Sequence, residues 1–354
     1  MNKSKLTAVL FAMAITVTWP VNVRAAETSD ITICFAGDMN LAEDYGTTQL
    51  IDSSAQGVLD CIDNKLVETM RSADMMIVNN EFTYSKRGAP LKGKAYTFRA
   101  DPRRVKVLDE LGVDAVYLAN NHVYDYGPDA MMDTFDTLDK AGIEYFGAGK
   151  DLDRACEPLY VDFDGLKVSF VAASRAEKNK MTPQATDTSA GILRCYDTSL
   201  FKQAIREAKA NSDICIAVVH WGTEYSTKLE KVQVRTAKEY IEAGADVIIG
   251  AHSHCLQGIE IIDNAPVLYS MGNYWFNGKT LDTCLANIRI HRTDNKSKTS
   301  TAKYDIDVQL IPGVQENWHT RSAKDKTEAR RIFDDLESIS INVDIDDNGW
   351  VTKK

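Results

Sequence analysis

The 354-residue sequence predicts an α/β fold, because strand-like apolar segments alternate with segments of helical periodicity along most of the chain. The strand-like segments are almost continuously apolar, which is typical of strands that are covered on both faces. Several of them also end in polar residues capable of chemistry, and ligands of open α/β sheets bind at the carboxyl ends of strands. Together these observations favour a sheet-based fold with a functional site at the strand ends.

Five strand-like segments have such polar ends. They are "ITICFAGDMN" with Asp38, "ADMMIVNNEF" with Glu81, "VDAVYLANNH" with Asn121 and His122, "DICIAVVHWG" with His220, and "ADVIIGAHSH" with His252 and His254. Between and around them, the pattern predicts helices over 102–111, 129–141, 199–210 and 231–243. The Asp-Gly pair in "VDFDGLKVSF" and the Asp263-Asn264 pair predict two hairpins.

The chain is expected to divide into a signal peptide (1–25), a main domain (31–313) and a charged helical tail (314–354). The first segment has two early lysines, an apolar stretch over 6–19 and small residues flanking Arg24, as in a secretory leader. A secreted or extracytoplasmic protein is therefore predicted, and a membrane anchor formed by an uncleaved leader is the alternative. No later segment contains about 18 uninterrupted apolar residues.

Composition excludes some classes of function. The net charge of −10 argues against a generic nucleic-acid binder, which needs clustered lysine and arginine. It does not exclude an anionic substrate, since a bound metal can neutralise charge locally. Among the seven cysteines, Cys34 and Cys215 lie in strand-like segments and are expected in the core; the other five could include disulfides, whose pairing the sequence leaves open.

The polar strand ends have the composition of a metal site. Four of the six histidines lie there, together with two carboxylates and an asparagine, and thiolate motifs of the CxxC type are absent. Such nitrogen and oxygen donors suit zinc, manganese or iron. His252 and His254 alternate, so in a strand both imidazoles would face the same side. Taken singly, each residue could be a cap, a turn or a core residue; their shared position at five strand ends favours a common site.

Seven short stretches together resemble a known family. They are "FAGDMN", "NNEFTYSKRGAP", "YTFRADP", "LANNHVYDYG", "HWGTEY", "GAHSHCLQGIE" and "YSMGNYWF", spanning 35–276. In these stretches the chain resembles the CapA/PgsA-type capsule synthesis proteins of poly-γ-glutamate biosynthesis, within the calcineurin-like metallophosphoesterase superfamily. The resemblance implies a four-layer α/β/β/α sandwich with two mixed β-sheets face to face and helices outside.

The resemblance also implies roles for the polar residues. Asp38 and His254 would bind a first metal, Asn121, His220 and His252 would bind a second, and Glu81 would bridge the two. Asn40 is a further candidate ligand of the first metal, at a position where the superfamily has a histidine, and Glu81 stands where the superfamily has an aspartate. An amide is a poorer ligand than imidazole and a longer bridge can change the metal spacing, so either one or two ions are expected.

Further residues are predicted around this centre. The resemblance implies that His122 is the general acid or a transition-state contact. Asp125, three residues later, is predicted to accept a hydrogen bond from His122 and fix its tautomer; a helix-cap role for Asp125 is the alternative. The candidate substrate contacts are Arg99, Arg175, Glu224 and Tyr225, with surface ion pairs as the alternative for the two arginines. The basic cluster Lys86, Arg87, Lys92 and Lys94 is expected to be a solvated loop or to hold a polyanion.

The residues and the family resemblance together leave three functions open. The first is a metal-dependent hydrolase of an acidic polymer or a phosphoester, in which bound metal lowers the pKa of water towards neutrality and cleavage of a γ-glutamyl amide is conceivable. The second is a non-catalytic accessory protein that binds poly-γ-glutamate during assembly or export, with membrane-bound capsule synthesis machinery as a partner. The third is a secreted α/β domain with purely structural histidines.

Overall fold

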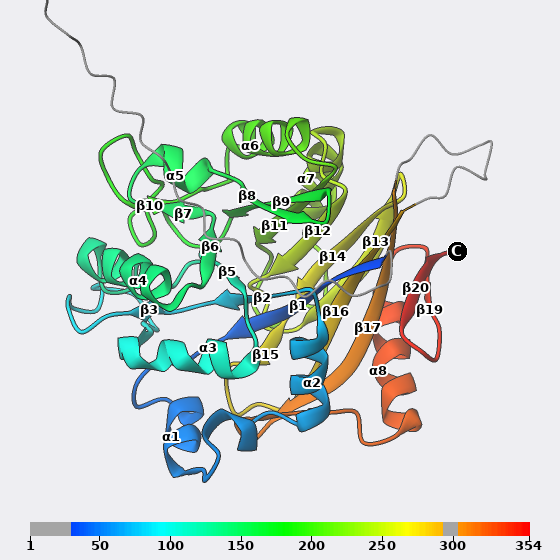
Figure 1. Cartoon of the computed structure of the whole chain (residues 1–354), viewed down its shortest axis with the longest axis horizontal. Helices are drawn as coiled ribbons and strands as arrows, with labels where there is room; N and C mark the ends of the chain where they lie inside the picture. The colour runs from blue at the N-terminus through cyan, green and yellow to red at the C-terminus, as the bar shows by residue number, and fades with distance from the viewer. Residues whose placement is uncertain (1–29, 293–303) are drawn as a thin grey trace, which may run out of the picture.

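The computed structural model describes residues 30–292 and 304–354. The leader expected over 1–25 and most of the polar run that follows residue 292 therefore lie outside the described residues. Within the described part, two large sheets lie against each other and helices flank them (Figure 1). No helix in this part is long and apolar enough to cross a bilayer.

The larger sheet has ten strands in the order β19-β20-β17-β16-β1-β2-β5-β6, with β15 beside β1 and β18 beside β17. Its strands are β1 (Asp30–Met39), β2 (Met75–Asn80), β5 (Ala115–Tyr117), β6 (Glu144–Phe146), β15 (Asn273–Trp275), β16 (Leu281–Arg292), β17 (Tyr304–Glu316), β18 (His319–Ser322), β19 (Val343–Ile345) and β20 (Trp350–Lys353). The neighbours β1, β2, β5 and β6 pair in parallel, whereas β1 pairs with β16 antiparallel. The sheet is therefore mixed.

The second sheet has six strands in the order β13-β14-β12-β11-β9-β8. They are β8 (Leu159–Phe163), β9 (Leu166–Ser174), β11 (Ile214–His220), β12 (Val247–Ala251), β13 (Leu256–Ile262) and β14 (Ala265–Met271). The four central strands are parallel and the two edge strands are joined by hairpins. Asp164, Gly165, Asp263 and Asn264 all have positive φ, as tight two-residue hairpins require, so both predicted hairpins are confirmed.

Two small ribbons and eight α-helices complete the described part. The ribbons pair β3 (Thr83–Tyr84) with β4 (Arg99–Ala100) and β7 (Ala148–Gly149) with β10 (Gly191–Ile192). The helices are α1 (Gly46–Ser53), α2 (Asn64–Ser72), α3 (Lys106–Leu111), α4 (Pro128–Ala141), α5 (Leu152–Cys156), α6 (Ser199–Ala210), α7 (Lys231–Glu242) and α8 (Lys326–Ser338), with 3-10 turns η1 (Gly57–Asp60) and η2 (Pro102–Val105). The helix predicted over 102–111 is thus split into η2 and α3.

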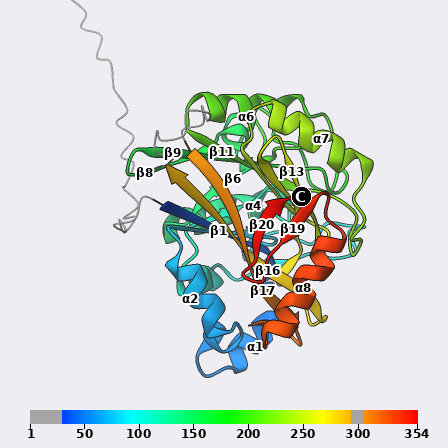
Figure 2. The same ribbon diagram turned by 90° about the vertical axis from the view of Figure 1, so that its right-hand side faces the viewer.

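Three separate apolar cores establish the layers. Phe35 and Ile77 from the larger sheet pack with Phe170 and Val218 of the second sheet in a core between the sheets. Cys34 and Ala36, the neighbours of Phe35, point to the opposite face, where they join residues of α2, α3 and α4. A third core lies under α6 and α7 on the outer face of the second sheet. Figures 1 and 2 show these helices on the outer sides, which confirms the expected four-layer sandwich.

The C-terminal segment is part of this fold. The boundary expected at 313 falls inside β17, and the following residues add β18, β19 and β20 to the larger sheet. The helix expected in this segment is present as α8, whose Phe333 and Leu336 pack into the core between the sheets.

The seven cysteines all lie within the described residues, and none of them forms a disulfide there. Cys34 and Cys215 are buried core residues, as predicted.

Candidate metal centre

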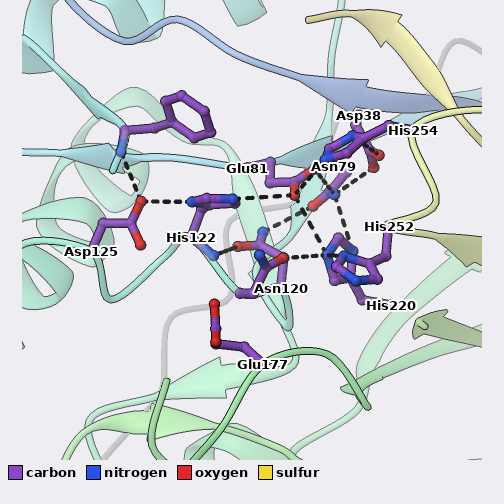
Figure 3. A network of polar contacts seen from close by, with 12 residues as sticks. Asp38, Asn79, Glu81, Asn120, His122, Asp125, Glu177, His220, His252 and His254 are labelled. Carbon is purple, nitrogen blue, oxygen red and sulfur yellow. Dashed lines mark hydrogen bonds and ion pairs between the residues drawn. The ribbon is translucent and has the colours of Figure 1, made fainter. Parts of the chain in front are cut away.

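The polar residues expected to form a site lie together where parallel strands of both sheets end (Figure 3). In the larger sheet, Asp38 is near the end of β1 and Glu81 follows β2 directly. In the second sheet, His220 ends β11 and His252 follows β12. Because the two sheets face each other, their strand ends enclose one buried cluster.

Gly37 explains how β1 brings Asp38 into this cluster. A Cβ at Gly37 would lie 2.0 Å from the carbonyl oxygen of Gly272, so only glycine permits this approach of the two chain segments. The adjacent Asp38 N–H donates to the same Gly272 carbonyl at 2.8 Å. The regular register between β1 and β2 is also interrupted between Phe35 and Asp38. The local backbone therefore fixes the direction of the Asp38 carboxylate.

Two sets of three potential ligands share Glu81. One set is Glu81, His220 and His252, and the other is Asp38, Glu81 and His254; in each set the donor atoms lie within 4.8 Å of one another. Oε1 of Glu81 is 3.5 Å from Nε2 of His220 and 4.0 Å from Nε2 of His254. The structure thus places Glu81 between the two sets, where the resemblance implied a bridging carboxylate.

Asn121 also faces this cluster. Its side-chain Oδ1 lies 2.7 Å from Nε2 of His220, and Nδ1 of His252 lies 3.1 Å from the same nitrogen. All three side chains are buried. The three predicted ligands of the second metal are therefore next to one another, with the Glu81 carboxylate beside them.

Whether a cation fits this cluster can be judged from the hydrogen-bond partners of the two carboxylates. Glu81 is fully buried, and its Oε1 has no hydrogen-bond partner within the described part of the chain. Oδ2 of Asp38 is 3.2 Å from Nδ1 of His254 but likewise lacks a well-formed hydrogen bond among these residues. Buried polar atoms are nearly always satisfied by a partner, and buried charges are paired or bind metals. A cation among these oxygens and imidazoles would supply the missing partner.

The electrostatics of the cluster agree with this interpretation. Burial and the neighbouring Asp38 charge raise the pKa of Glu81 well above its ordinary range. Burial and the adjacent imidazoles lower the pKa of His220 and of His252 well below the ordinary histidine range. Burial also acts to lower the pKa of His254, but the nearby Asp38 carboxylate outweighs it and the net shift is upward. The set therefore contains neutral imidazoles ready to bind metal and a carboxylate that lacks a compensating charge.

His122 and Asp125 form a pair next to the cluster. Nδ1 of His122 lies 2.7 Å from Oδ2 of Asp125, so Nδ1 is the protonated nitrogen that donates to this carboxylate. Nε2 faces the cluster, 4.0 Å from Oε1 of Glu81. Burial lowers the pKa of His122, and the Asp125 charge offsets only part of that effect. Helix α4 begins after Gly127 without a side-chain cap, so Asp125 contacts His122 instead of capping the helix.

The remaining predicted residues have other surroundings. The amide oxygen of Asn40 accepts the N–H of Ala42 at 2.8 Å, which gives that oxygen a local backbone partner. Arg99 donates to the carbonyls of Arg87 and Gly88, and its guanidinium lies 4.2 Å from the Tyr126 ring. These contacts hold a loop and do not bring Arg99 to the cluster.

The second predicted arginine has a similar role. The guanidinium of Arg175 packs 4.5 Å from the ring of Tyr196 and donates to its carbonyl. By contrast, the half-exposed ring of Tyr225 lies 5.7 Å from that of His254, and the exposed Glu224 is close enough to raise the pKa of Glu81. Tyr225 and Glu224 are thus at the mouth of the cluster, whereas both arginines support loops.

Three asparagines that the sequence analysis did not select hold the cluster together. Nδ2 of Asn79 donates to Oδ1 of Asp38 at 2.7 Å and to Oε2 of Glu81 at 3.1 Å. Asn120 donates to Oδ1 of Asn79, and its own oxygen accepts the N–H of His122. Asn273 lies 2.8 Å from Nδ1 of His254. The repeated Asn-Asn pair before Glu81 and before His122 is the pattern that could have indicated two of them.

The fold and the cluster define a class of protein: a four-layer α/β/β/α domain with a candidate two-metal centre of histidine, carboxylate and asparagine ligands at the strand ends. The chain belongs to the bacterial capsule synthesis protein family PGA_cap, whose profile matches residues 32–278.

Curated relatives agree with this assignment. The chain is 32% identical over 207 residues to the capsule biosynthesis protein CapA of Bacillus anthracis, covering 55% of this chain and 48% of that protein. It is 27% identical over 297 residues to the PGA biosynthesis protein CapA of Bacillus subtilis, covering 80% and 76%. It is 29% identical over 211 residues to a probable polyglutamine synthesis accessory protein of Mycobacterium tuberculosis, covering 57% and 55%. The matches thus span about half the length of two of these relatives.

Solved structures with a similar chain course include a hypothetical protein from Thermus thermophilus, with a TM-score of 0.46 and 14% identity over 81% of this chain and 100% of that one. Another is the NAD nucleotidase of Haemophilus influenzae, with a TM-score of 0.44 and 12% identity over 88% of this chain and 57% of that one.

Proposed function

We propose that this protein is a metal-dependent hydrolase of capsule synthesis, acting on a phosphoester or on an amide of an acidic polymer. The observation that carries the proposal is Oε1 of the Glu81 carboxylate, which both ligand sets share and which has no hydrogen bond in the described structure, beside the His122–Asp125 pair. Structural histidines alone would not require a buried carboxylate oxygen without a hydrogen-bond partner at their centre.

The residues that would hold the cations are Asp38, Glu81 and His254 at one position, and Glu81, Asn121, His220 and His252 at the other. Divalent cations bound there would polarise a phosphoryl or carbonyl oxygen and make water more acidic. His122 is oriented by Asp125, so its Nε2 can hold or deliver a proton at the leaving group. Asn79 and Asn120 keep the carboxylates and the His122 backbone in place.

The substrate class comes from the relatives. Two of the relatives are named as capsule or PGA biosynthesis proteins, and a third is named as a probable polyglutamine synthesis accessory protein. These names support poly-γ-glutamate or an intermediate of its assembly as the substrate. An acidic polymer presents carboxylates, which are suitable ligands for hard divalent cations and so can approach this centre. Because a leader is expected over 1–25, we propose that the reaction takes place outside the cytoplasm, next to membrane-bound synthesis machinery.

A non-catalytic accessory role in polymer assembly is the second candidate. One relative is described as an accessory protein, and a metal centre at a strand-end cluster can bind carboxylates without breaking a bond. The two candidates differ in what His122 does: hydrolysis needs proton transfer at its Nε2, whereas polymer binding through the cations does not.

Turnover assays with a matched histidine control separate these candidates. The mature protein, loaded in turn with Mn²⁺, Zn²⁺ or Fe²⁺, is assayed with p-nitrophenyl phosphate, bis-p-nitrophenyl phosphate and poly-γ-glutamate. We expect metal-dependent turnover of at least one of them, about 10²–10⁴-fold lower in His122→Ala. The control is His319→Ala, since His319 is exposed and its Nδ1 donates to the nearby Asn317 carbonyl. Tight polymer binding without turnover, unaffected by His122→Ala, would favour the accessory role.

A further inference from the structure

Lys94 is a buried cation beside the candidate centre, and the proposed function leaves its role open. Its side chain is only 4% exposed, although it lies in a loop with several exposed basic residues. Nζ donates to Oδ1 of Asp125 at 2.6 Å and to the backbone carbonyl of Asn121, and Oε2 of Glu177 lies 3.8 Å away. Such a lysine is enclosed by three acceptors and is not directed at solvent.

The Asp125 carboxylate is held by donors on both oxygens. Lys94 occupies Oδ1, while the backbone N–H of Phe98 donates to Oδ2 at 2.7 Å, the same oxygen that contacts Nδ1 of His122. A carboxylate fixed by one donor can rotate about its terminal torsion, which is broad in aspartate. With Lys94 on the far oxygen, the carboxylate plane is set, and the oxygen that faces His122 is set with it.

The Asn121 peptide is held in the same way. Its carbonyl accepts from Lys94 and also from the hydroxyl of Thr182, at 2.8 Å. The segment that carries Thr182 is tied down by Arg194, which donates to the carbonyls of Thr182 and Glu177. Two loops distant in sequence therefore meet at the peptide that joins a candidate metal ligand to His122. Lys94 is the side chain that contacts both the peptide and Asp125.

We propose that Lys94 is a positioning residue, which fixes the orientation of His122 through Asp125 and through the Asn121 peptide. This inference rests on the proposed hydrolase function, in which the orientation of His122 matters. Removing a side chain that orients a functional residue through hydrogen bonds typically lowers activity by about 10–100-fold. The alternative is a buried ion pair that contributes only to stability.

A double-mutant cycle distinguishes positioning from stability. We expect Lys94→Met to lower kcat about 10–100-fold, with metal content retained and KM changed much less. In a His122→Ala background, Lys94→Met should then lower turnover by less than about threefold, because its effect passes through His122. The control is Lys92→Met, an exposed lysine of the same loop. An equal loss in both backgrounds, or an unchanged kcat in Lys94→Met, would overturn the proposal; Lys94→Gln replaces Lys94→Met if the latter does not fold.

A second readout does not depend on turnover. The proton shared by Nδ1 of His122 and Asp125 should give a downfield ¹H NMR resonance in the metal-free protein, assigned by its absence in His122→Ala. We expect this resonance to remain in Lys92→Met and to be lost or shifted in Lys94→Met and Lys94→Gln. A wild-type spectrum without it, or one that Lys94→Met leaves unchanged, would contradict the positioning role. If the resonance behaves as expected but no substrate turns over, the hydrolase proposal fails while the positioning inference stands.

Discussion

Oε1 of Glu81 lies 3.5 Å from Nε2 of His220, and the two residues come from different sheets of the sandwich. Glu81 follows β2 in the larger sheet, and His220 ends β11 in the second sheet. Both side chains are fully buried, and this carboxylate oxygen has no hydrogen-bond partner in the described part of the structure. The packing of one sheet on the other therefore brings an imidazole and this carboxylate oxygen together, and this creates a position where a cation could bind.

Replacing single histidines should separate metal binding from turnover. His252→Ala and His220→Ala each remove a donor from the ligand set that contains Glu81, so both variants should lose about one equivalent of metal. His122→Ala should keep its metal, because His122 is paired with Asp125 and lies outside both sets. Elemental analysis of the purified variants measures this difference. Equal metal loss in all three variants would contradict the role given to His122.

Glu81→Gln should have opposite effects on the metal-free and the metal-loaded protein. The folded-state pKa of Glu81 is raised, so its contribution to stability is present below the unfolded value and is lost as pH rises through the folded value. At neutral pH without metal, the substitution should stabilise the fold by about 1–3 kcal/mol, since an amide neither buries a charge nor has to take up a proton on folding.

Denaturant unfolding with and without a chelator tests the Glu81 prediction. The metal-dependent gain in stability should disappear in Glu81→Gln and persist in Glu224→Gln, whose carboxylate is exposed. If Glu81→Gln destabilised the chelated protein, Oε1 of Glu81 would have a protein partner that the structure does not show.

The two metal positions should respond differently to acid. Metal binds the neutral imidazole, so a ligand with a higher pKa loses its metal at a higher pH. The pKa of His254 is raised above its ordinary value, about 6.5, whereas those of His220 and His252 are lowered well below it. Between about pH 8 and 5, the Asp38–His254 position should therefore release its cation first. Equilibrium dialysis with metal analysis should show two steps, and His254→Ala should remove the upper one; simultaneous release of both cations would argue against separate sites.

Gly37→Ala should damage the centre without touching a ligand. The added methyl would meet the Gly272 carbonyl at 2.0 Å and displace β1 at Asp38. We expect a loss of stability of about 1–3 kcal/mol, as for other overpacked sites, together with weaker metal binding. Gly142→Ala is the control: its φ of 71° makes alanine unfavourable by about 1 kcal/mol, but the space around it is open and it caps α4 away from the ligands. Metal affinity should fall only in Gly37→Ala.

The positions of the strand ends were predictable, because an apolar run followed by a polar residue can be recognised in the local sequence. Asp38, Glu81, His220 and His252 each directly follow or end such a run, and the structure brings all four together. The hydrogen-bond partners were not predictable from the pattern. Asn79 lies between two carboxylates only because β1 and β2 are neighbours in the sheet.

The basic loop and the tail show where local sequence was insufficient. Lys92 is exposed as expected of a solvated loop, but the side chain of Lys94, two residues later, is buried at its contact with Asp125. Only the tertiary fold distinguishes them, since Asp125 is far along the chain. In the tail, β19 and β20 are three and four residues long, too short for a periodic pattern. Their place in the sheet depends on pairing with distant sequence, because β20 pairs with β17 and β19 pairs with β20.

Crystals of the metal-loaded protein, measured at the absorption edge of the bound metal, test the central claim most directly. We predict anomalous density within bonding distance of Oε1 of Glu81, with His220 and His252 on one side and Asp38 and His254 on the other. A fully loaded protein whose anomalous density lay elsewhere, with the Glu81 carboxylate bonded only to protein atoms, would contradict the account.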